Sequence, residues 1–300
     1  MNDAQPAPNS PVYDRTTQDV GNIVEFGHLN VRIPDQRLAT LFYIMGLGLT
    51  RDPYLVVGID NMWVNAGTAQ FHLPLGPAQV LRGTTGLVFP DLDALEARLT
   101  AVKPRLDGTF FAFARTGDHL AVSCPWGNRF RCHTPDPTRF GRIQLGMPYV
   151  EVDVGRGTSA GIARFYNEII ANPADIGHDA AGSFVRVPMG LNENLMFRES
   201  DRALPPFDGH HVQVALADFS GPHRRLLAHG LITEESNQSQ YRFENIIDLD
   251  TGATLATIEH EVRSMRHPMF ARPFTNRDPT ITNARYAPGR EAAAHALPPQ

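Results

Sequence analysis

The sequence predicts an α+β protein built from four βαβββ units, arranged as two tandem modules of two units each. Segments with alternating apolar and polar residues are followed by a helical apolar pattern and then by further alternating segments. This order occurs four times along the 300 residues. The first and third occurrences also share a Phe-Tyr pair. Its tyrosine lies at the same spacing in both, since Tyr43 follows His28 as Tyr166 follows Glu151. We therefore expect a repeated fold.

The first unit opens with a strand over residues 24–33, in which Leu29, Val31 and Ile33 form one apolar face. Pro34 and Asp35 begin a helix, since Asp is a favourable N-cap residue. The apolar stripe of this helix has the i, i+3, i+4, i+7 spacing and consists of Leu38, Leu41, Phe42 and Met45. The closing strands are predicted at Tyr54–Ile59, Met62–Asn65 and Gln70–Leu73.

The other three units repeat this order. Their opening strands are predicted at Thr85–Phe89, Tyr149–Val154 and His211–Leu216. Their helices carry Leu92, Leu95 and Leu99, then Ile162, Phe165 and Ile169, then the segment Ser220–Gly230. Because consecutive units have similar spacing, we expect the first to pair with the second and the third with the fourth. The predicted parts are a flexible arm at 1–21, an N-terminal module at 22–134, a C-terminal module at 146–265 and an extension at 266–300.

Composition excludes several classes of protein. The net charge is −5 with no basic stripe, so we expect no nucleic-acid partner. No apolar run approaches membrane-spanning length, and the first residues lack a signal-peptide pattern. Cys124 and Cys132 are the two cysteines, which excludes a disulfide framework and suits a reducing cytoplasm. The sequence therefore predicts a cytoplasmic protein that binds a small molecule and that could form a homo-oligomer.

Four short motifs carry a resemblance to a known family. They are Gly27-His28-Leu29 before Phe42-Tyr43, the segment Gly86–Leu95, the turn Pro125–Asn128, and the strand Gly209–Leu216. In this order they resemble the vicinal-oxygen-chelate superfamily, which includes glyoxalase I, bleomycin-resistance proteins and type I extradiol dioxygenases. The resemblance implies that two βαβββ units form a cup-shaped sheet. It also implies a divalent metal held by the first strand of each unit and the last strand of the second.

In the C-terminal module the first two of these positions are Glu151 and His211. Counting from Gly252 puts the third position at Ala256, which has no donor atom. The nearby carboxylates are Glu259 and Glu261, and the apolar alternation around them turns Glu259 into the cup. We therefore predict that Glu151, His211 and Glu259 hold Fe, Mn, Zn or Ni.

In the N-terminal module the same positions are His28, Gly86 and Arg131, of which only His28 is a suitable ligand. We expect this module to be a degenerate structural partner. A non-standard site of His28, His72 and His133 stays open as an alternative. Elsewhere, Tyr241 is a candidate catalytic residue at the C-terminal cup, and His178 is a candidate for its rim.

The leading functional hypothesis is a metal-dependent glyoxalase-like or dioxygenase-like enzyme that binds a small oxygen-rich substrate through adjacent oxygens. One rival is a metal-free protein that binds or sequesters a small molecule, as bleomycin-resistance proteins do. Another is a structural or regulatory subunit. After the last predicted strand, the basic and aromatic run 263–274 could fold back as a lid or pack against a second subunit.

Overall fold

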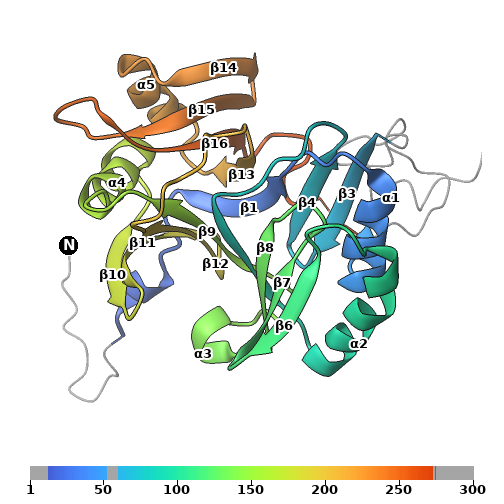
Figure 1. Ribbon diagram of the computed structural model, residues 1–300. Coiled ribbons are helices and arrows are strands. Elements are labelled where there is room, and N and C mark those ends of the chain that lie inside the picture. Colours follow the sequence, from blue (N-terminus) through green and yellow to red (C-terminus); the bar gives the residue numbers. More distant parts are fainter. Residues whose placement is uncertain (1–12, 53–59, 273, 275–300) are drawn as a thin grey trace, which may run out of the picture.

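The computed structural model describes residues 13–52, 60–272 and 274, and it contains two eight-stranded mixed sheets with helices packed against them (Figure 1). The predicted strand at Tyr54–Ile59, most of the arm and most of the C-terminal extension lie outside these residues. The predicted α+β class, with two βαβββ units in each sheet, is confirmed. Within the described residues, no helix is both long enough and apolar enough to cross a membrane.

Sheet 1 has the strand order β14-β15-β16-β13-β1-β4-β3-β2 and combines the first and fourth units. The first unit contains β1 (Ile23–Asn30), α1 (Gln36–Ala39), the π-helical segment η2 (Thr40–Gly46), β2 (Thr50–Arg51), β3 (Asn61–Ala66) and β4 (Ala69–Pro74). The fourth unit contains β13 (His211–Leu216), α5 (Ser220–Ala228), β14 (Ile232–Asn237), β15 (Gln240–Ile247) and β16 (Thr254–Ser264). A 3₁₀ turn, η1 (Arg15–Gln18), precedes β1.

Sheet 2 has the strand order β10-β11-β12-β9-β5-β8-β7-β6 and combines the second and third units. The second unit contains β5 (Gly83–Val88), α2 (Leu92–Val102), η3 (Lys103–Arg105), β6 (Ala112–Thr116), β7 (His119–Ser123) and β8 (Arg129–His133). The short helix α3 (Pro137–Phe140) lies in the linker. The third unit contains β9 (Gly146–Val154), α4 (Ser159–Phe165), η4 (Tyr166–Ile170), β10 (Asp175–Asp179), β11 (Gly182–Met189) and β12 (Glu193–Glu199).

The pairing of units differs from the consecutive pairing that the sequence suggested. Strand β1 pairs antiparallel with β13, and β5 pairs antiparallel with β9. Each sheet is therefore completed by a unit from the other half of the sequence. This matters for the site, because any cluster on one cup face must draw its residues from these unit pairs.

Local sequence signals explain where the helices begin. The side chain of Asp35 accepts hydrogen bonds from the backbone N–H groups of Arg37 and Leu38 at the start of α1. Asp91 does the same for Asp93 and Ala94 at the start of α2. Both N-caps directly follow a proline, and Asp35 is where the sequence predicted the first helix to begin.

The apolar core lies between the two sheets. In η2, the ring of Tyr43 lies 5.1 Å from Phe71 of sheet 1, and the ring of Phe42 lies 5.6 Å from Phe130 of sheet 2. The two phenylalanines of the facing sheets also contact each other, with 5.9 Å between ring centroids. Both cysteines are buried free thiols. Because the inner faces are apolar, the polar cup faces of the two sheets point outward, on opposite sides of the core.

Candidate metal centre

Four side chains with metal-binding donors project from adjacent strands onto the cup face of sheet 1. They are His28 on β1, His72 on β4, His211 on β13 and Glu261 on β16. Their neighbours along these strands, Leu29, Phe71, Val212 and Val262, are buried in the core. Because successive side chains of a strand point to opposite faces, the four donors share the cup face.

The donor atoms of this cluster lie at distances that suit one ion. The Nε2 atoms of His28 and His211 are 3.4 Å apart, and Nε2 of His211 is 3.4 Å from Oε2 of Glu261. One ring nitrogen from each of His28, His72 and His211 lies within 4.8 Å of the others. Two donors bound at about 2.1 Å from one tetrahedral ion are roughly 3.4 Å apart. The cluster therefore needs little rearrangement to coordinate a metal.

The protonation states of the cluster also suit a metal. Burial lowers the pKa of His28 well below its ordinary value, and burial together with His211 lowers the pKa of His72 to about 3. Both imidazoles are therefore neutral near pH 7 and keep a lone pair for coordination. Burial alone would raise the pKa of Glu261, but its hydrogen bond with His211 and the charge of Arg263 hold that pKa far below its usual range.

Neighbouring side chains fix the donors in place. The indole of Trp63 stacks on the His72 ring, with 3.8 Å between centroids, and meets the His28 ring edge-on. Arg242 forms ion pairs with Glu259 and Glu261, and Arg263 lies 2.5 Å from Oε1 of Glu261. The indole of Trp63 and two guanidinium groups thus restrict the motion of the cluster.

Of the predicted metal ligands, His211 lies in the cluster and Glu259 lies on the same cup face. Oε1 of Glu259 is 3.4 Å from Nδ1 of His211, on the side of the ring that faces away from His28. The carboxylate beside Nε2 of His211 belongs instead to Glu261, the other acid that the sequence left in consideration. Glu259 therefore contacts His211 without facing the other donors of the cluster.

Glu151, the third predicted ligand, lies in the other sheet, and the structure does not bring it together with His211. It is on β9, where its carboxylate oxygens are 3.2 Å from Arg131 and 3.3 Å from Arg198. The cause is the pairing of the sheets, which joins β9 to β5 and β12 and leaves β13 in sheet 1. The predicted trio is therefore corrected to a cluster that spans the first and fourth units.

The other candidates are also separated from this cluster. Tyr241 is on the core face of β15, where its hydroxyl lies 3.5 Å from the backbone oxygen of Phe219 and burial raises its pKa. It alternates with Arg242, which is on the cup face, so the predicted catalytic role for Tyr241 is not supported. His133 is on β8 of sheet 2, with Nε2 2.9 Å from the Tyr149 hydroxyl. His178 is exposed on β10 of sheet 2.

The residues present fit the divalent metal that the fold suggests. The donor set is three imidazoles and one carboxylate, which suits Fe, Mn, Zn or Ni. Nε2 of His72 is buried and has no hydrogen-bond partner among the described residues, which leaves one donor of the cluster unused. A bound ion would satisfy this nitrogen.

Comparison with known proteins supports the fold. No family model matches the chain, and no curated protein matches it. Among solved structures, a candidate dioxygenase from Bacillus subtilis is similar with a TM-score of 0.55 and 15% identity, covering 93% of this chain and 97% of its own. Glyoxalase I from Zea mays is similar with a TM-score of 0.54 and 10% identity, covering 80% of this chain and 92% of its own. The chain therefore has the vicinal-oxygen-chelate fold that its motifs predicted.

Proposed function

We propose that this protein is a divalent-metal-dependent enzyme that acts on a small, oxygen-rich organic substrate in the cup of sheet 1. His28, His72, His211 and Glu261 would hold the metal. The observation that carries this proposal is the convergence of three imidazole nitrogens within 4.8 Å, with the Glu261 carboxylate beside them. When bound, the ion would supply a Lewis acid for two adjacent oxygens of the substrate.

The residues around the metal ligands have separate tasks in this proposal. Oε1 of Glu259 lies 3.4 Å from Nδ1 of His211, and this contact would help to keep Nε2 turned toward the other donors. Arg242 positions both carboxylates through its ion pairs. Trp63 supplies an apolar wall and holds the His72 ring by stacking. These contacts orient the ligands before substrate binds, which lowers the cost of assembling the site.

Metal binding tests the proposal directly. Titration of purified, chelator-stripped protein with Mn, Fe(II), Zn and Ni should show about one high-affinity site, measured by calorimetry and by metal content. His28→Ala and His211→Ala should weaken that binding by at least about 100-fold, since removing a supporting group alone costs 10–100-fold. His223→Ala is the matched control, because His223 also contacts a carboxylate, with Nε2 2.7 Å from Glu235, but lies on α5. Equal metal affinity in all four proteins would refute the metal centre.

One observation favours a second function, a metal-free cup that binds small molecules. Glu261 already forms ion pairs with Arg242 and Arg263, which neutralise it without a cation. An aromatic diol and an α-hydroxyketone, each with oxygens on adjacent carbons, separate the two functions. Turnover by metal-loaded protein that disappears with a chelator supports the enzyme. Binding that is unchanged by the chelator, without turnover, supports the metal-free cup.

A further inference from the structure

The cup face of sheet 2 has the same arrangement of strands as the cup face of sheet 1 but different side chains. Its first strands carry Gly86 and Glu151, and its last strands carry Arg131 and Arg198. A Cβ atom on Gly86 would lie 2.3 Å from the Tyr149 ring, so that ring fills the space beside this glycine. Glu151 is held by the two arginines. These residues offer no cluster of neutral donors for a metal.

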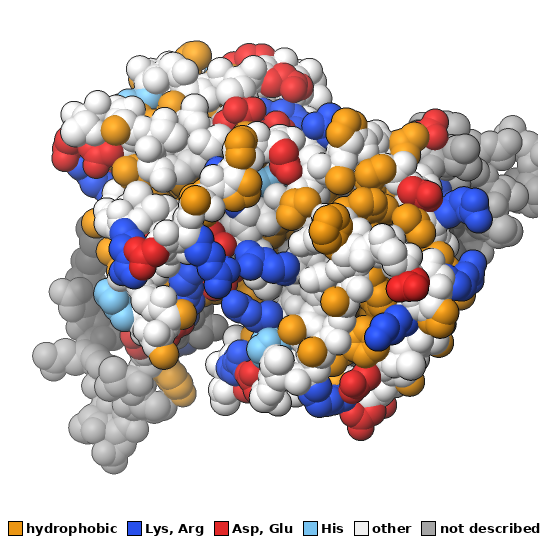
Figure 2. Space-filling view, in the orientation of Figure 1, with side chains coloured by type: hydrophobic (Ala, Val, Ile, Leu, Met, Phe, Trp, Pro, Cys, Tyr) orange, Lys and Arg blue, Asp and Glu red, His pale blue; other side chains and the backbone are white. Residues whose placement is uncertain are grey.

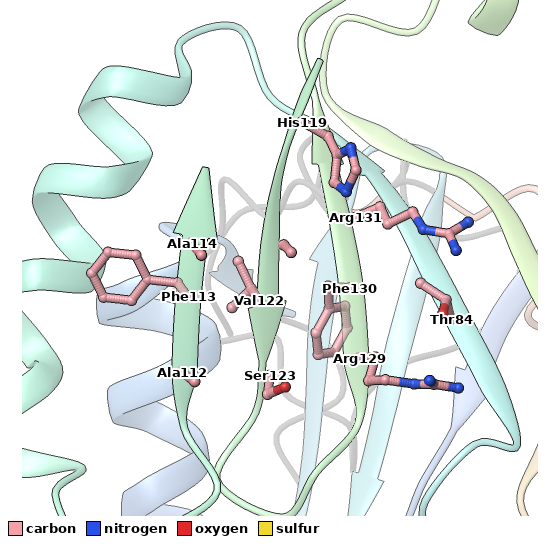
Figure 3. Close-up of a pocket in the computed structure, with 11 residues that line it drawn as sticks. Thr84, Ala112, Phe113, Ala114, His119, Val122, Ser123, Arg129, Phe130 and Arg131 are labelled. Atoms are coloured by element: carbon pink, nitrogen blue, oxygen red, sulfur yellow. The ribbon is translucent and has the colours of Figure 1, made fainter. Parts of the chain in front are cut away.

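The same face nevertheless contains a cavity of about 330 Å³ (Figure 3). Part of it lies over β6 and β7, where small side chains line it: Ala112, Ala114, Ala121 and Ser123. Figure 3 shows Arg129 and Arg131 extending from β8 to one side of the cavity, toward β5 and Thr84. The cavity is therefore bounded by a flat surface of small side chains and by two guanidinium groups. Its volume is at the small end of ordinary ligand pockets.

The charged side chains that line this cavity are basic. Among the described lining residues, Arg129 and Arg131 are positively charged, and none is acidic. Figure 2 shows basic side chains gathered over β8, β9 and β12 at the centre of this face. A cavity with this lining favours an anionic ligand over a neutral or cationic one.

The two arginines are held from behind by acids that are less exposed than they are. Arg129 is 3.3 Å from Asp153, and Arg131 is 3.2 Å from Glu151. The arginine side chains are 45% and 43% exposed, whereas those of Asp153 and Glu151 are 17% and 6% exposed. Nε of Arg129 also donates to the backbone oxygen of Gly83. The guanidinium groups are thus oriented in advance while part of each remains open to a ligand.

From this geometry we infer that the cup of sheet 2 is a second binding site, which takes a small planar carboxylic acid. Its ring lies on the surface made by Ala112, Ala114 and Ala121, and its carboxylate accepts hydrogen bonds from Arg129 and Arg131. An alanine surface suits a flat ring because methyl groups leave no ridges. The site requires no metal and is independent of the proposed activity in sheet 1.

Binding of 2-naphthoate, with 2-naphthamide as its neutral counterpart, tests this site by calorimetry. The acid should bind and the amide should bind at least tenfold more weakly. Arg131→Gln and Arg129→Gln should each weaken binding of 2-naphthoate by roughly tenfold to a hundredfold. This is the range for a hydrogen bond between charged groups. Ala114→Leu should also weaken binding of 2-naphthoate, because the larger leucine side chain occupies the flat surface while every charge is kept. This variant tests the site even where an arginine variant fails to fold.

Arg164→Gln is the matched control, since Arg164 is 42% exposed and ion-paired with Glu168 at a distance from the cavity. Binding of the acid should also persist in His211→Ala, which separates this site from the metal centre. Equal affinity for the acid and the amide would overturn the inference, as would unchanged affinity in the arginine and Ala114→Leu variants. Tight binding of inorganic phosphate without binding of 2-naphthoate would overturn the planar-acid assignment.

Discussion

The two cups of this molecule share one architecture and carry opposite chemistry. In each sheet, two first strands lie at the centre and a last strand flanks each of them. Sheet 1 places three imidazoles and one acid at these positions, namely His28, His72, His211 and Glu261. Sheet 2 places a glycine, an acid and two arginines there: Gly86, Glu151, Arg131 and Arg198. The fold thus determines where side chains converge, and the residue types at those positions determine what each cup can bind.

The largest expected difference separates Glu261 from Glu259, the two acids beside His211. Glu261→Gln should weaken metal binding by at least about 100-fold because it removes a ligand charge, whereas Glu259→Gln should weaken it by about tenfold because it removes only support for His211. Competition with a chromophoric chelator measures both affinities. A larger loss in Glu259→Gln than in Glu261→Gln would restore Glu259 as the ligand.

The next prediction concerns Glu151, the acid of sheet 2 that pairs with both Arg131 and Arg198. Glu151→Gln should leave metal affinity unchanged, because this residue is in the other cup. It should lower the free energy of unfolding by about 2 kcal/mol, since it leaves Arg131 and Arg198 without their shared buried partner, and Arg131 is partly solvated. Urea denaturation measures the stability. A loss of metal binding in a folded Glu151→Gln protein would contradict the assignment of the metal to sheet 1.

A further prediction concerns Gly86, which in sheet 2 takes the place of a proposed metal-binding side chain. Gly86→Ala should destabilise the protein by about 1–3 kcal/mol, because the new methyl group collides with the Tyr149 ring. Gly155→Ala is the control, since the nearest atom to its added Cβ is 3.9 Å away in Thr158, and a change within about 0.5 kcal/mol is expected. Thermal unfolding of both variants checks this. Equal stability would show that Tyr149 does not pack against Gly86.

The smallest effect is expected for Tyr241. Tyr241→Phe removes one weak hydrogen bond to the Phe219 backbone, so the stability should fall by about 0.5–1 kcal/mol. Metal affinity and turnover should not change, because this hydroxyl is on the core face of β15. Steady-state kinetics of the metal-loaded variant provide the check. A selective loss of kcat would return Tyr241 to the catalytic machinery.

Much of the fold could be predicted because its signals are local. Asp35 and Asp91 mark helix starts through their own hydrogen bonds to nearby N–H groups, and strand alternation separates His211 from Val212 without tertiary information. These signals depend on residues a few positions apart. They were sufficient to predict four βαβββ units, whereas the cup as the place for ligands was implied by the resemblance to the vicinal-oxygen-chelate superfamily.

The composition of the site could not be predicted because it depends on contacts between distant strands. His28, His72 and His211 were each considered from the sequence, but His28 and His72 were grouped with His133, and His211 with Glu151. Only the pairing of β1 with β13 brings His28 and His72 beside His211. Alternation also could not choose between Glu259 and Glu261, since both lie on the polar face of β16, and the choice depends on which ring nitrogen of His211 each contacts.

The pairing of the first unit with the fourth has a consequence for synthesis of the chain. Strand β1 acquires its neighbour β4 early, but its other edge has to wait for β13, which is more than 180 residues further along. Until then, the nascent chain presents an open strand edge that can pair with other chains. We expect holdase chaperones to protect this edge during translation, and the proposed metal site to be complete only after β16 has emerged, because β16 carries Glu261.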